Sequence, residues 1–340
     1  MQIVLEKNEK IKNPAEILQR IRALVADDIK TIDHLIHTEL SSSVPLTRDI
    51  TQHIFKTKGK RLRPLLVILA ARAFSQNQSL QHRHYEMAVV IEFVHTATLL
   101  HDDVNDHSDL RRGQRTANSV WGNAASVLVG DFLYSRAFQI LARHSDAEVM
   151  SVLSETTNAL AEGEVMQLMN QHDPELSEEN YFHVITQKTA KLFSAATEIG
   201  AILENATNQD KKAMADYGLH LGIIFQLVDD LLDYETSSEI TGKNIGDDLN
   251  EGKATLPLIY AIQNTTPDNS KFIRDVIKNG DVTALPKILT ILKETNAFEM
   301  TRKKATGHAI LAKNALKNIP NSAYRQALED LIAFAMQRNY

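Results

Sequence analysis

The chain has 340 residues, of which 37 are Lys or Arg and 43 are Asp or Glu, so its formal charge is −6. This mildly acidic balance predicts no nucleic-acid partner, because binding a polyanion needs a basic excess or at least a basic stripe. Cysteine is absent, which excludes disulfides, thiolate nucleophiles, iron–sulfur clusters and Cys-ligated zinc and is compatible with a reducing compartment.

Helix-breaking residues are scarce: the chain has 13 glycines and 8 prolines, and no proline lies between Pro64 and Pro174. Long helices joined by short turns fill such a span most easily. Residues 214–232 are apolar around nearly the whole helical circumference, which is typical of a helix inside a bundle. The sequence therefore predicts an all-α fold, a large helical bundle that forms a single domain over residues 1–340. Residues from about 265 are more polar and are predicted to form a peripheral helical cap.

The beginning of the chain carries charges every few residues and lacks the apolar core of a secretory signal. The longest apolar stretch, from Met87 to Leu100, already contains Glu92 and His95 and is shorter than the roughly 20 residues that cross a bilayer. We therefore expect a soluble, cytoplasmic protein without a transmembrane segment.

The first chemically distinctive segment is a basic turn before Pro64, formed by Lys58, Lys60, Arg61 and Arg63. Guanidinium and ammonium groups are the donors that phosphate oxygens require. Such a turn on its own is more often a solvated loop, so its interpretation as an anion site depends on the acidic motifs that follow.

An aspartate cluster ends the apolar helix predicted around residues 87–100. Asp102, Asp103 and Asp106 lie at about 0°, 100° and 40° around a helix that turns about 100° per residue, so all three project within one arc. Arg111 and Arg112 follow within about two turns. One helix end therefore presents three carboxylates with two guanidinium groups nearby.

A second cluster repeats the first, because Leu-Val-Asp-Asp-Leu-Leu-Asp at 227–233 echoes Leu-His-Asp-Asp-Val-Asn-Asp at 100–106. Asp229, Asp230 and Asp233 again share one face and follow an apolar run. Carboxylates on one face repel one another, and without His or Cys partners they suit Mg²⁺, which shares its ligands between carboxylates and substrate phosphates. A solvated acidic helix end is the alternative for either cluster alone. Two clusters that each follow a strongly apolar stretch favour a diphosphate held between them through metal ions.

Together these motifs resemble the trans-isoprenyl diphosphate synthases over most of the chain, from about residue 59 to the C-terminal helices. The matching segments are Gly-Lys-Arg-Leu-Arg-Pro (59–64), Leu-Leu-His-Asp-Asp-Val-Asn-Asp (99–106), Arg-Arg-Gly (111–113), Lys-Thr (188–189), Phe-Gln-Leu-Val-Asp-Asp-Leu-Leu-Asp (225–233) and Gly-Lys-Asn-Ile-Gly-Asp-Asp-Leu-Asn-Glu-Gly-Lys (242–253). Segments around residues 92–103 and 122–132 are similar to the bacterial octaprenyl diphosphate synthases that make the ubiquinone side chain. The resemblance implies an isoprenoid-synthase bundle with a central active-site cavity.

The resemblance also implies roles for individual residues. Asp102, Asp106 and Asp229 would ligate Mg²⁺, about three ions per site with substrate bound, and Asp103, Asp230 and Asp233 would support them. The residues implied to bind isopentenyl diphosphate are Lys60, Arg63, His95 and Arg112. Those implied to grip or surround the allylic diphosphate are Arg111, Lys188, Thr189, Gln226, Lys243 and Lys253. The implied catalytic set is Asp102, Asp103, Asp106, Arg111, Lys188, Asp229, Asp230 and Lys243.

The implied reaction condenses isopentenyl diphosphate onto an allylic diphosphate, farnesyl diphosphate, to give a long all-trans polyprenyl diphosphate. Charge withdrawn from the allylic diphosphate would ionise its carbon–oxygen bond, after which the isopentenyl double bond attacks. Three alternatives stay open at this stage: a shorter-chain geranylgeranyl or farnesyl diphosphate synthase, a non-catalytic subunit of a heteromeric synthase, and a terpene cyclase. Two intact clusters plus the basic turn argue against the last two.

Chain length is expected to depend on Ala97 and Thr98, five and four residues before Asp102. Both side chains are small and would let a growing tail pass, although they would equally permit close helix packing. Phe132 and Leu128 are weak candidates for the tunnel floor. A homodimer is expected from the resemblance, with an apolar helix around 118–140 as its interface.

Overall fold

The computed structural model describes residues 13–56, 59–75, 79–111, 113–144, 146–235 and 245–338. Within these ranges every long element is an α-helix, and the only strands are the two-residue β1 (Leu110–Arg111) and β2 (Gln114–Arg115), which pair antiparallel. The all-α prediction is confirmed.

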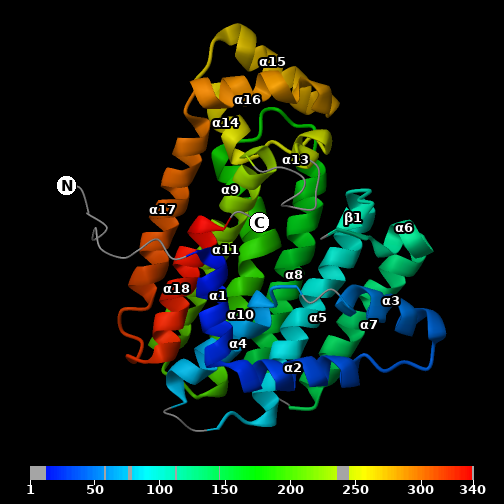
Figure 1. The fold of residues 1–340 in the computed structure, drawn as a ribbon, viewed down its shortest axis with the longest axis vertical. Helices are drawn as coiled ribbons and strands as arrows, with labels where there is room; N and C mark the ends of the chain where they lie inside the picture. The colour runs from blue at the N-terminus through cyan, green and yellow to red at the C-terminus, as the bar shows by residue number, and fades with distance from the viewer. Residues whose placement is uncertain are drawn as a thin grey trace.

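The helices form an elongated bundle (Figure 1). In chain order they are α1 (Pro14–Leu24), α2 (Ala26–Glu39), α3 (Pro45–Lys56), α4 (Leu62–Phe74), α5 (His82–Asn105), α6 (Ala117–Trp121), α7 (Asn123–Ala142), α8 (Ala147–Asn170), α9 (Glu178–Ile185), the π-helical turn η1 (Thr186–Ala190), α10 (Lys191–Leu203), α11 (Asn208–Glu235), α13 (Asp247–Asn250), α14 (Leu256–Gln263), α15 (Pro267–Asn279), the 3₁₀ turn η2 (Val282–Ala284), α16 (Leu285–Glu294), α17 (Ala297–Ala315) and α18 (Ala323–Gln337).

The core is built on the most apolar helices. Residues 64–71 of α4 are all buried, and α4 packs against α5, α10 and α18. Twelve residues of α11, all between Met214 and Tyr234, are also buried, and the helix contacts α10, η1, α14, α17 and α18. The predicted central position of residues 214–232 is therefore confirmed.

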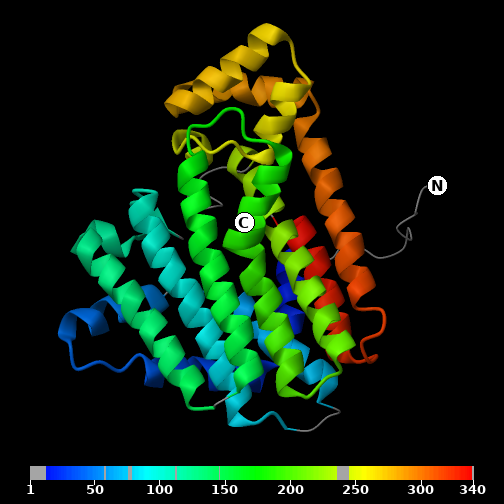
Figure 2. The same ribbon diagram turned by 180° about the vertical axis from the view of Figure 1, so that it is seen from behind.

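The two ends of the bundle are closed by crossing helices. In Figures 1 and 2 the long helices α5, α7, α8 and α11 run roughly along the long axis, α2 crosses one end, and α15 and α16 lie across the other. α17 and α18 run along the bundle, and their side chains Ala305, Leu328 and Phe334 are fully buried. Within the described ranges, no helix is both long enough and apolar enough to cross a bilayer.

The single apolar helix expected around 118–140 is wrong in one respect, because the structure divides it into α6 and α7. Gly122 separates them with φ 85° and ψ 160°, a left-handed, non-helical conformation that favours glycine. The apolar pattern continues on both sides of Gly122, so periodicity alone conceals the break.

Candidate active site

The first aspartate cluster occupies the last turn of α5, where Asp106 is the C-cap residue. Three carboxylates at a helix C-terminus oppose both one another and the negative end of the helix dipole. Each receives a cation from a different segment: Lys188 Nζ lies 3.7 Å from Asp102 Oδ1, and Arg111 Nε donates to Asp103 Oδ1 at 2.7 Å. Lys253 Nζ lies 3.5 Å from Asp106 Oδ1.

The three carboxylates of this cluster do not face the same way. Asp103 is buried and turned toward the β1–β2 hairpin, and burial raises its pKa although Arg111 opposes the shift. Asp102 and Asp106 are half-buried and meet lysines from η1 and from the segment after α13. Their separation from Asp103 follows from the helical angles, since residues four apart share a face more closely than adjacent ones.

The second cluster lies at the end of α11. Of its two adjacent carboxylates, Asp229 is exposed and Asp230 is buried. The Asp229 side chain is 55% exposed and lies 3.4 Å from the guanidinium of Arg338. Asp230 is 2% exposed and accepts hydrogen bonds from the Tyr181 hydroxyl and, at 2.8 Å, from Gln226 Nε2. Burial, followed by the charge of Asp248, raises the pKa of Asp230 to about 8. Asp229 can therefore meet a ligand, whereas Asp230 holds the neighbouring side chains in place.

The π-helical turn η1 connects the two clusters. Lys188 faces Asp102, and its neighbour Thr189 donates from Oγ1 to Gln226 Oε1 at 2.9 Å. Gln226 in turn donates to Asp230. A π turn carries an extra residue, so two consecutive side chains can serve one site. The clusters, which lie more than 120 residues apart in sequence, belong to one continuous polar network.

Two glycines allow η1 to lie this close to its neighbours. A Cβ on Gly163 of α8 would lie 2.6 Å from the Lys188 backbone nitrogen, and one on Gly222 of α11 would lie 2.6 Å from Ala190 Cα. Backbone atoms cannot be displaced by a rotamer change, so α8 and α11 need glycine at these positions. The position of Lys188 thus depends on residues of two other helices.

Glu164 is a site residue that the motifs did not indicate. It follows Gly163 on α8 and accepts a hydrogen bond from Lys188 Nζ at 2.8 Å. Burial raises the pKa of Glu164 to about 7, the charge of Lys188 lowers it, and that of Asp102 raises it again. The only sequence signal is an acidic residue beside a glycine in the middle of a long helix.

The arginines of the basic turn have different partners. Arg61 is the N-cap residue of α4 with φ 44°, and its buried guanidinium pairs with Asp33 at 3.1 Å and Glu92 at 3.7 Å. Arg63 Nη1 is 3.0 Å from His95 Nε2. Arg61 is therefore part of the core, while Arg63 and His95, both expected at the isopentenyl diphosphate site, lie within hydrogen-bonding distance of each other.

Lys60 and Arg63 each lie over a phenylalanine ring. Lys60 Nζ lies 5.9 Å from the centre of the Phe334 ring, and the Arg63 guanidinium lies 4.5 Å from that of Phe193. The Phe225 ring contacts both, with centroid separations of 5.1 Å to Phe193 and 6.2 Å to Phe334. The positive end of α4 adds to these cations, so this corner suits an anion.

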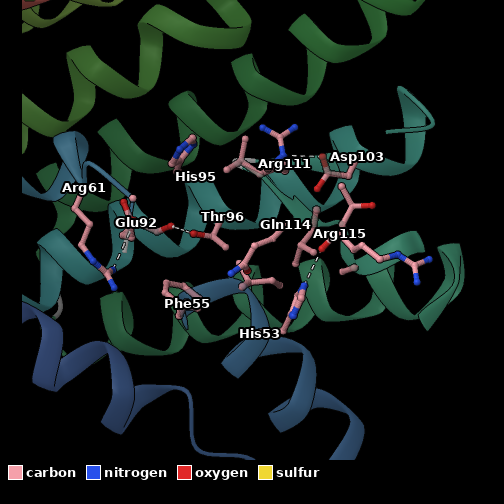
Figure 3. Close-up of a pocket in the computed structure, with 16 residues that line it drawn as sticks. His53, Phe55, Arg61, Glu92, His95, Thr96, Asp103, Arg111, Gln114 and Arg115 are labelled. Atoms are coloured by element: carbon pink, nitrogen blue, oxygen red, sulfur yellow. Dashed lines mark hydrogen bonds and ion pairs between the residues drawn. The ribbon is translucent and has the colours of Figure 1, made fainter. Parts of the chain in front are cut away.

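A cleft opens beside the first cluster and encloses about 680 Å³ of empty space, its open mouth included. Figure 3 shows His95, Asp103 and Arg111 along one side and His53 and Phe55 of α3 along the other. His95 and Arg111, which the resemblance assigns to different diphosphates, therefore line a common space.

The predicted chain-length residues lie on α5 inside the core. Ala97 is fully buried, and Thr98 is half-buried with its hydroxyl donating to the His95 carbonyl at 2.8 Å. Of the suggested floor residues, Phe132 is half-buried below the Arg136 guanidinium, whereas Leu128 is 66% exposed. Tyr134 of α7 stacks on His101, the residue before Asp102, with ring centroids 6.1 Å apart, and burial, followed by the charges of Asp102 and Glu164, raises its pKa to about 12.

Three predicted residues, Lys58, Arg112 and Lys243, lie outside the described residues. The carboxylates that are described do not form a ready-made cage: no group of three or more His, Asp or Glu side chains in these ranges converges on one point. Asp102 Oδ1 is buried and accepts no hydrogen bond there. Such a hard oxygen donor set fits Mg²⁺, which takes few protein ligands and completes its shell with water and phosphate.

Comparison with known proteins agrees with this geometry. A family model described as "Polyprenyl synthetase" matches residues 44–292. Octaprenyl diphosphate synthase of Escherichia coli K12 is 46% identical over 323 residues, covering 95% of this chain and 99% of that protein. The enzyme of the same name from Haemophilus influenzae is 44% identical over 324 residues, covering 95% and 98%. The crystal structure of a polyprenyl synthase from Caulobacter crescentus CB15, complexed with calcium and isoprenyl diphosphate, superposes with a TM-score of 0.91 at 39% identity, covering 98% of this chain and 100% of that one.

A helical bundle with one aspartate cluster at the end of α5 and another at the end of α11, each against basic side chains, has the fold of an all-α isoprenoid synthase. The chain belongs to the polyprenyl synthetase family, which confirms the resemblance in its motifs. It is a long-chain trans-polyprenyl diphosphate synthase.

Proposed function

We propose that this synthase extends farnesyl diphosphate with isopentenyl diphosphate to octaprenyl diphosphate, the side-chain precursor of ubiquinone. The observation that carries the proposal is that consecutive residues of η1 contact both clusters, since Lys188 lies against Asp102 and Thr189 is hydrogen-bonded to Gln226, which donates to Asp230. This arrangement supports a single diphosphate site served by both aspartate clusters. The names of two relatives at 44–46% identity support the octaprenyl product.

In the proposed mechanism the chain's own residues hold and polarise the allylic diphosphate. Asp102, Asp106 and Asp229 are proposed to hold about three Mg²⁺ ions, which would withdraw charge from the leaving group when bound. Lys188 and Lys253 lie against the same carboxylates and would grip the diphosphate oxygens. The carbon–oxygen bond then breaks with both electrons going to the diphosphate, and Arg111, Lys243 and Thr189 are proposed to complete this grip.

The second substrate is proposed to bind at the basic corner. Lys60, Arg63, His95 and Arg112 would bind the isopentenyl diphosphate so that its double bond faces the allylic cation. Forming the new carbon–carbon bond releases one proton, which the departing diphosphate can take. Water must be excluded, because it would quench the cation.

We further propose a cytoplasmic homodimer in which residues 1–340 form one synthase domain. The side chains of α17 and α18 support one domain, because Ala312, Leu316 and Leu328 belong to the same buried cluster as α4 and α10. Exposed apolar side chains on residues 118–140, Val120, Val127 and Leu128, support an interface there. The absence of cysteine is compatible with a reducing compartment.

One assay tests the product. The protein is incubated with farnesyl diphosphate, labelled isopentenyl diphosphate and Mg²⁺, and the dephosphorylated products are sized by chromatography against polyprenol standards. We expect the main product to co-migrate with octaprenol. A main product of geranylgeranyl length would favour the shorter-chain alternative, and a purified protein that forms no product would contradict the proposal.

A further inference from the structure

Each of the three proposed metal ligands lies against a basic side chain among the described residues. The closest distances are 3.7 Å from Lys188 to Asp102, 3.5 Å from Lys253 to Asp106 and 3.4 Å from Arg338 to Asp229. Lys188 and Lys253 were expected at the site, but nothing in the motifs points to Arg338. The shared geometry raises the question of whether Arg338 has a comparable role.

Arg338 is the C-cap residue of α18, and its side chain is only 7% exposed. Its guanidinium lies 4.7 Å from the centre of the Phe225 ring, and Nη2 donates to the Phe225 carbonyl. Nη1 and Nη2 both reach Asp229 Oδ1 at 3.4 Å. A stacked, forked guanidinium of this kind fixes the direction of its carboxylate, which a lysine cannot do equally well.

The same group of phenylalanine rings connects Arg338 to the basic residues Lys60 and Arg63. Lys60 lies over the Phe334 ring and Arg63 over the Phe193 ring, while Arg338 lies over the Phe225 ring. Burial lowers the pKa of Arg338, and the charge of Asp229 opposes that shift. A buried guanidinium is costly unless it is paired, so this contact stabilises α18 against α11.

We infer that Arg338 is a positioning residue that serves as the internal counter-ion of Asp229, holding the second cluster ready until a divalent cation and a diphosphate arrive. This inference rests on the proposed function, because it takes Asp229 as a metal ligand. It differs from a purely structural role in one respect: bound Mg²⁺ would replace the charge that Arg338 supplies, whereas it could not replace lost packing.

The test compares thermal unfolding of the full-length protein without added metal and with saturating Mg²⁺ plus inorganic pyrophosphate. Arg338→Met keeps most of the contact with Phe225 but removes the charge. We expect it to lower the metal-free Tm by about 2 °C, and to lower Tm by clearly less when Mg²⁺ and pyrophosphate are present, because only the lost hydrogen bond to the Phe225 carbonyl is then left unreplaced. Arg338→Lys should lie between Arg338→Met and the wild type.

The matched control is Arg325→Met on the same helix. Arg325 also pairs with a carboxylate, Glu329 at 3.2 Å, and donates to a backbone carbonyl, Ile319 at 3.0 Å. Its loss should lower Tm equally under both conditions. In an Asp229→Asn background, Arg338→Met should lower the metal-free Tm by less than it does in the wild type, because only the contacts with Phe225 are then lost.

An equal decrease for Arg338→Met under both conditions would overturn the inference and leave the proposed function intact. A wild-type protein that Mg²⁺ and pyrophosphate fail to stabilise would instead contradict the proposed function. If Arg338→Met does not fold, Arg338→Gln replaces it in the same comparison, with the same outcomes.

Discussion

Ala97 is the residue at which product length can be altered most directly. Its fully buried side chain lies on α5, five residues before Asp102. Tyrosine at this position should obstruct the growing tail and shift the main product to farnesyl or geranylgeranyl diphosphate. Because the site is closely packed, the substitution should also destabilise the fold by about 1–3 kcal/mol.

Chromatographic sizing of the products checks this prediction, and thermal unfolding measures the cost in stability. Ala97→Ser is the control, since its side chain is nearly as small and should leave product length unchanged. A folded, active Ala97→Tyr protein that still makes the wild-type product would show that the tail does not pass this position.

At the residue scale, sequence reasoning succeeded where a role follows from residue type and helical angle. Asp102, Asp103 and Asp106 were expected within one arc; lysines from other segments meet Asp102 and Asp106, whereas Asp103 is buried against Arg111. Glu164 and Arg338 were missed because their roles come from contacts across 24 and 109 residues, for which one sequence contains no signal. Arg61 shows the opposite error. Its place in the basic turn suggested an anion site, but its guanidinium is buried and pairs with Asp33.

At the scale of elements, η1 lies between α8 and α11 and depends on a glycine in each of them. A Gly163→Ala methyl would lie 2.6 Å from the Lys188 backbone nitrogen, so η1 would have to move. We expect kcat/KM to fall about tenfold or more, since small displacements of positioning groups are costly, with a loss of about 1–3 kcal/mol in stability. Steady-state kinetics and chemical denaturation measure the two effects.

Gly307→Ala on α17 is the matched control, because a Cβ there would meet nothing within 4 Å. Alanine inside a helix is favoured over glycine by about 0.5–1 kcal/mol, so this variant should be as active as the wild type and at least as stable. Full activity in Gly163→Ala would mean that η1 tolerates displacement and that its position is not critical.

The long helices could be predicted because apolar periodicity and the scarcity of proline determine them almost completely. The π turn could not, since one extra residue in a helix leaves no mark on composition. The break at Gly122 was concealed by the apolar residues on both sides. Helix content is thus a local property, whereas the irregularities that shape the site depend on tertiary packing.

For the whole molecule, the exposed face of α7 provides a test of the proposed homodimer. Leu128 is 66% exposed, an unusual degree for a leucine in the middle of a long helix, and α8 adds Val165 and Met169 at 57% and 76%. Leu128→Arg should place an unpaired charge in the interface and yield a monomer, measured by light scattering after size exclusion. The control is Ile310→Arg on α17, where the isoleucine is also exposed, and this variant should remain a dimer. Identical masses for the wild type, Leu128→Arg and Ile310→Arg would contradict this interface.

The last prediction concerns the pH dependence of stability in the metal-free protein. Burial raises the pKa of Asp230 to about 8 and those of Glu164 and Glu251 to about 7, all above their ordinary values. An acid whose folded-state pKa is raised binds its proton more tightly in the native state, so stability falls as pH rises toward that pKa. His308, with its pKa lowered to about 4, and His84 and His220, whose pKa values burial also lowers, act in the opposite direction, but mainly below pH 7. Between pH 6.5 and 8 these carboxylates therefore dominate, and the free energy of unfolding should decrease by about 3 kcal/mol.

Urea denaturation between pH 6.5 and 8 measures how steeply the free energy of unfolding falls with pH. Asp230→Asn and Glu164→Gln should each reduce it, because neither amide can lose a proton, and a stability that rises with pH in this interval would show that the carboxylates are already ionised in the metal-free site.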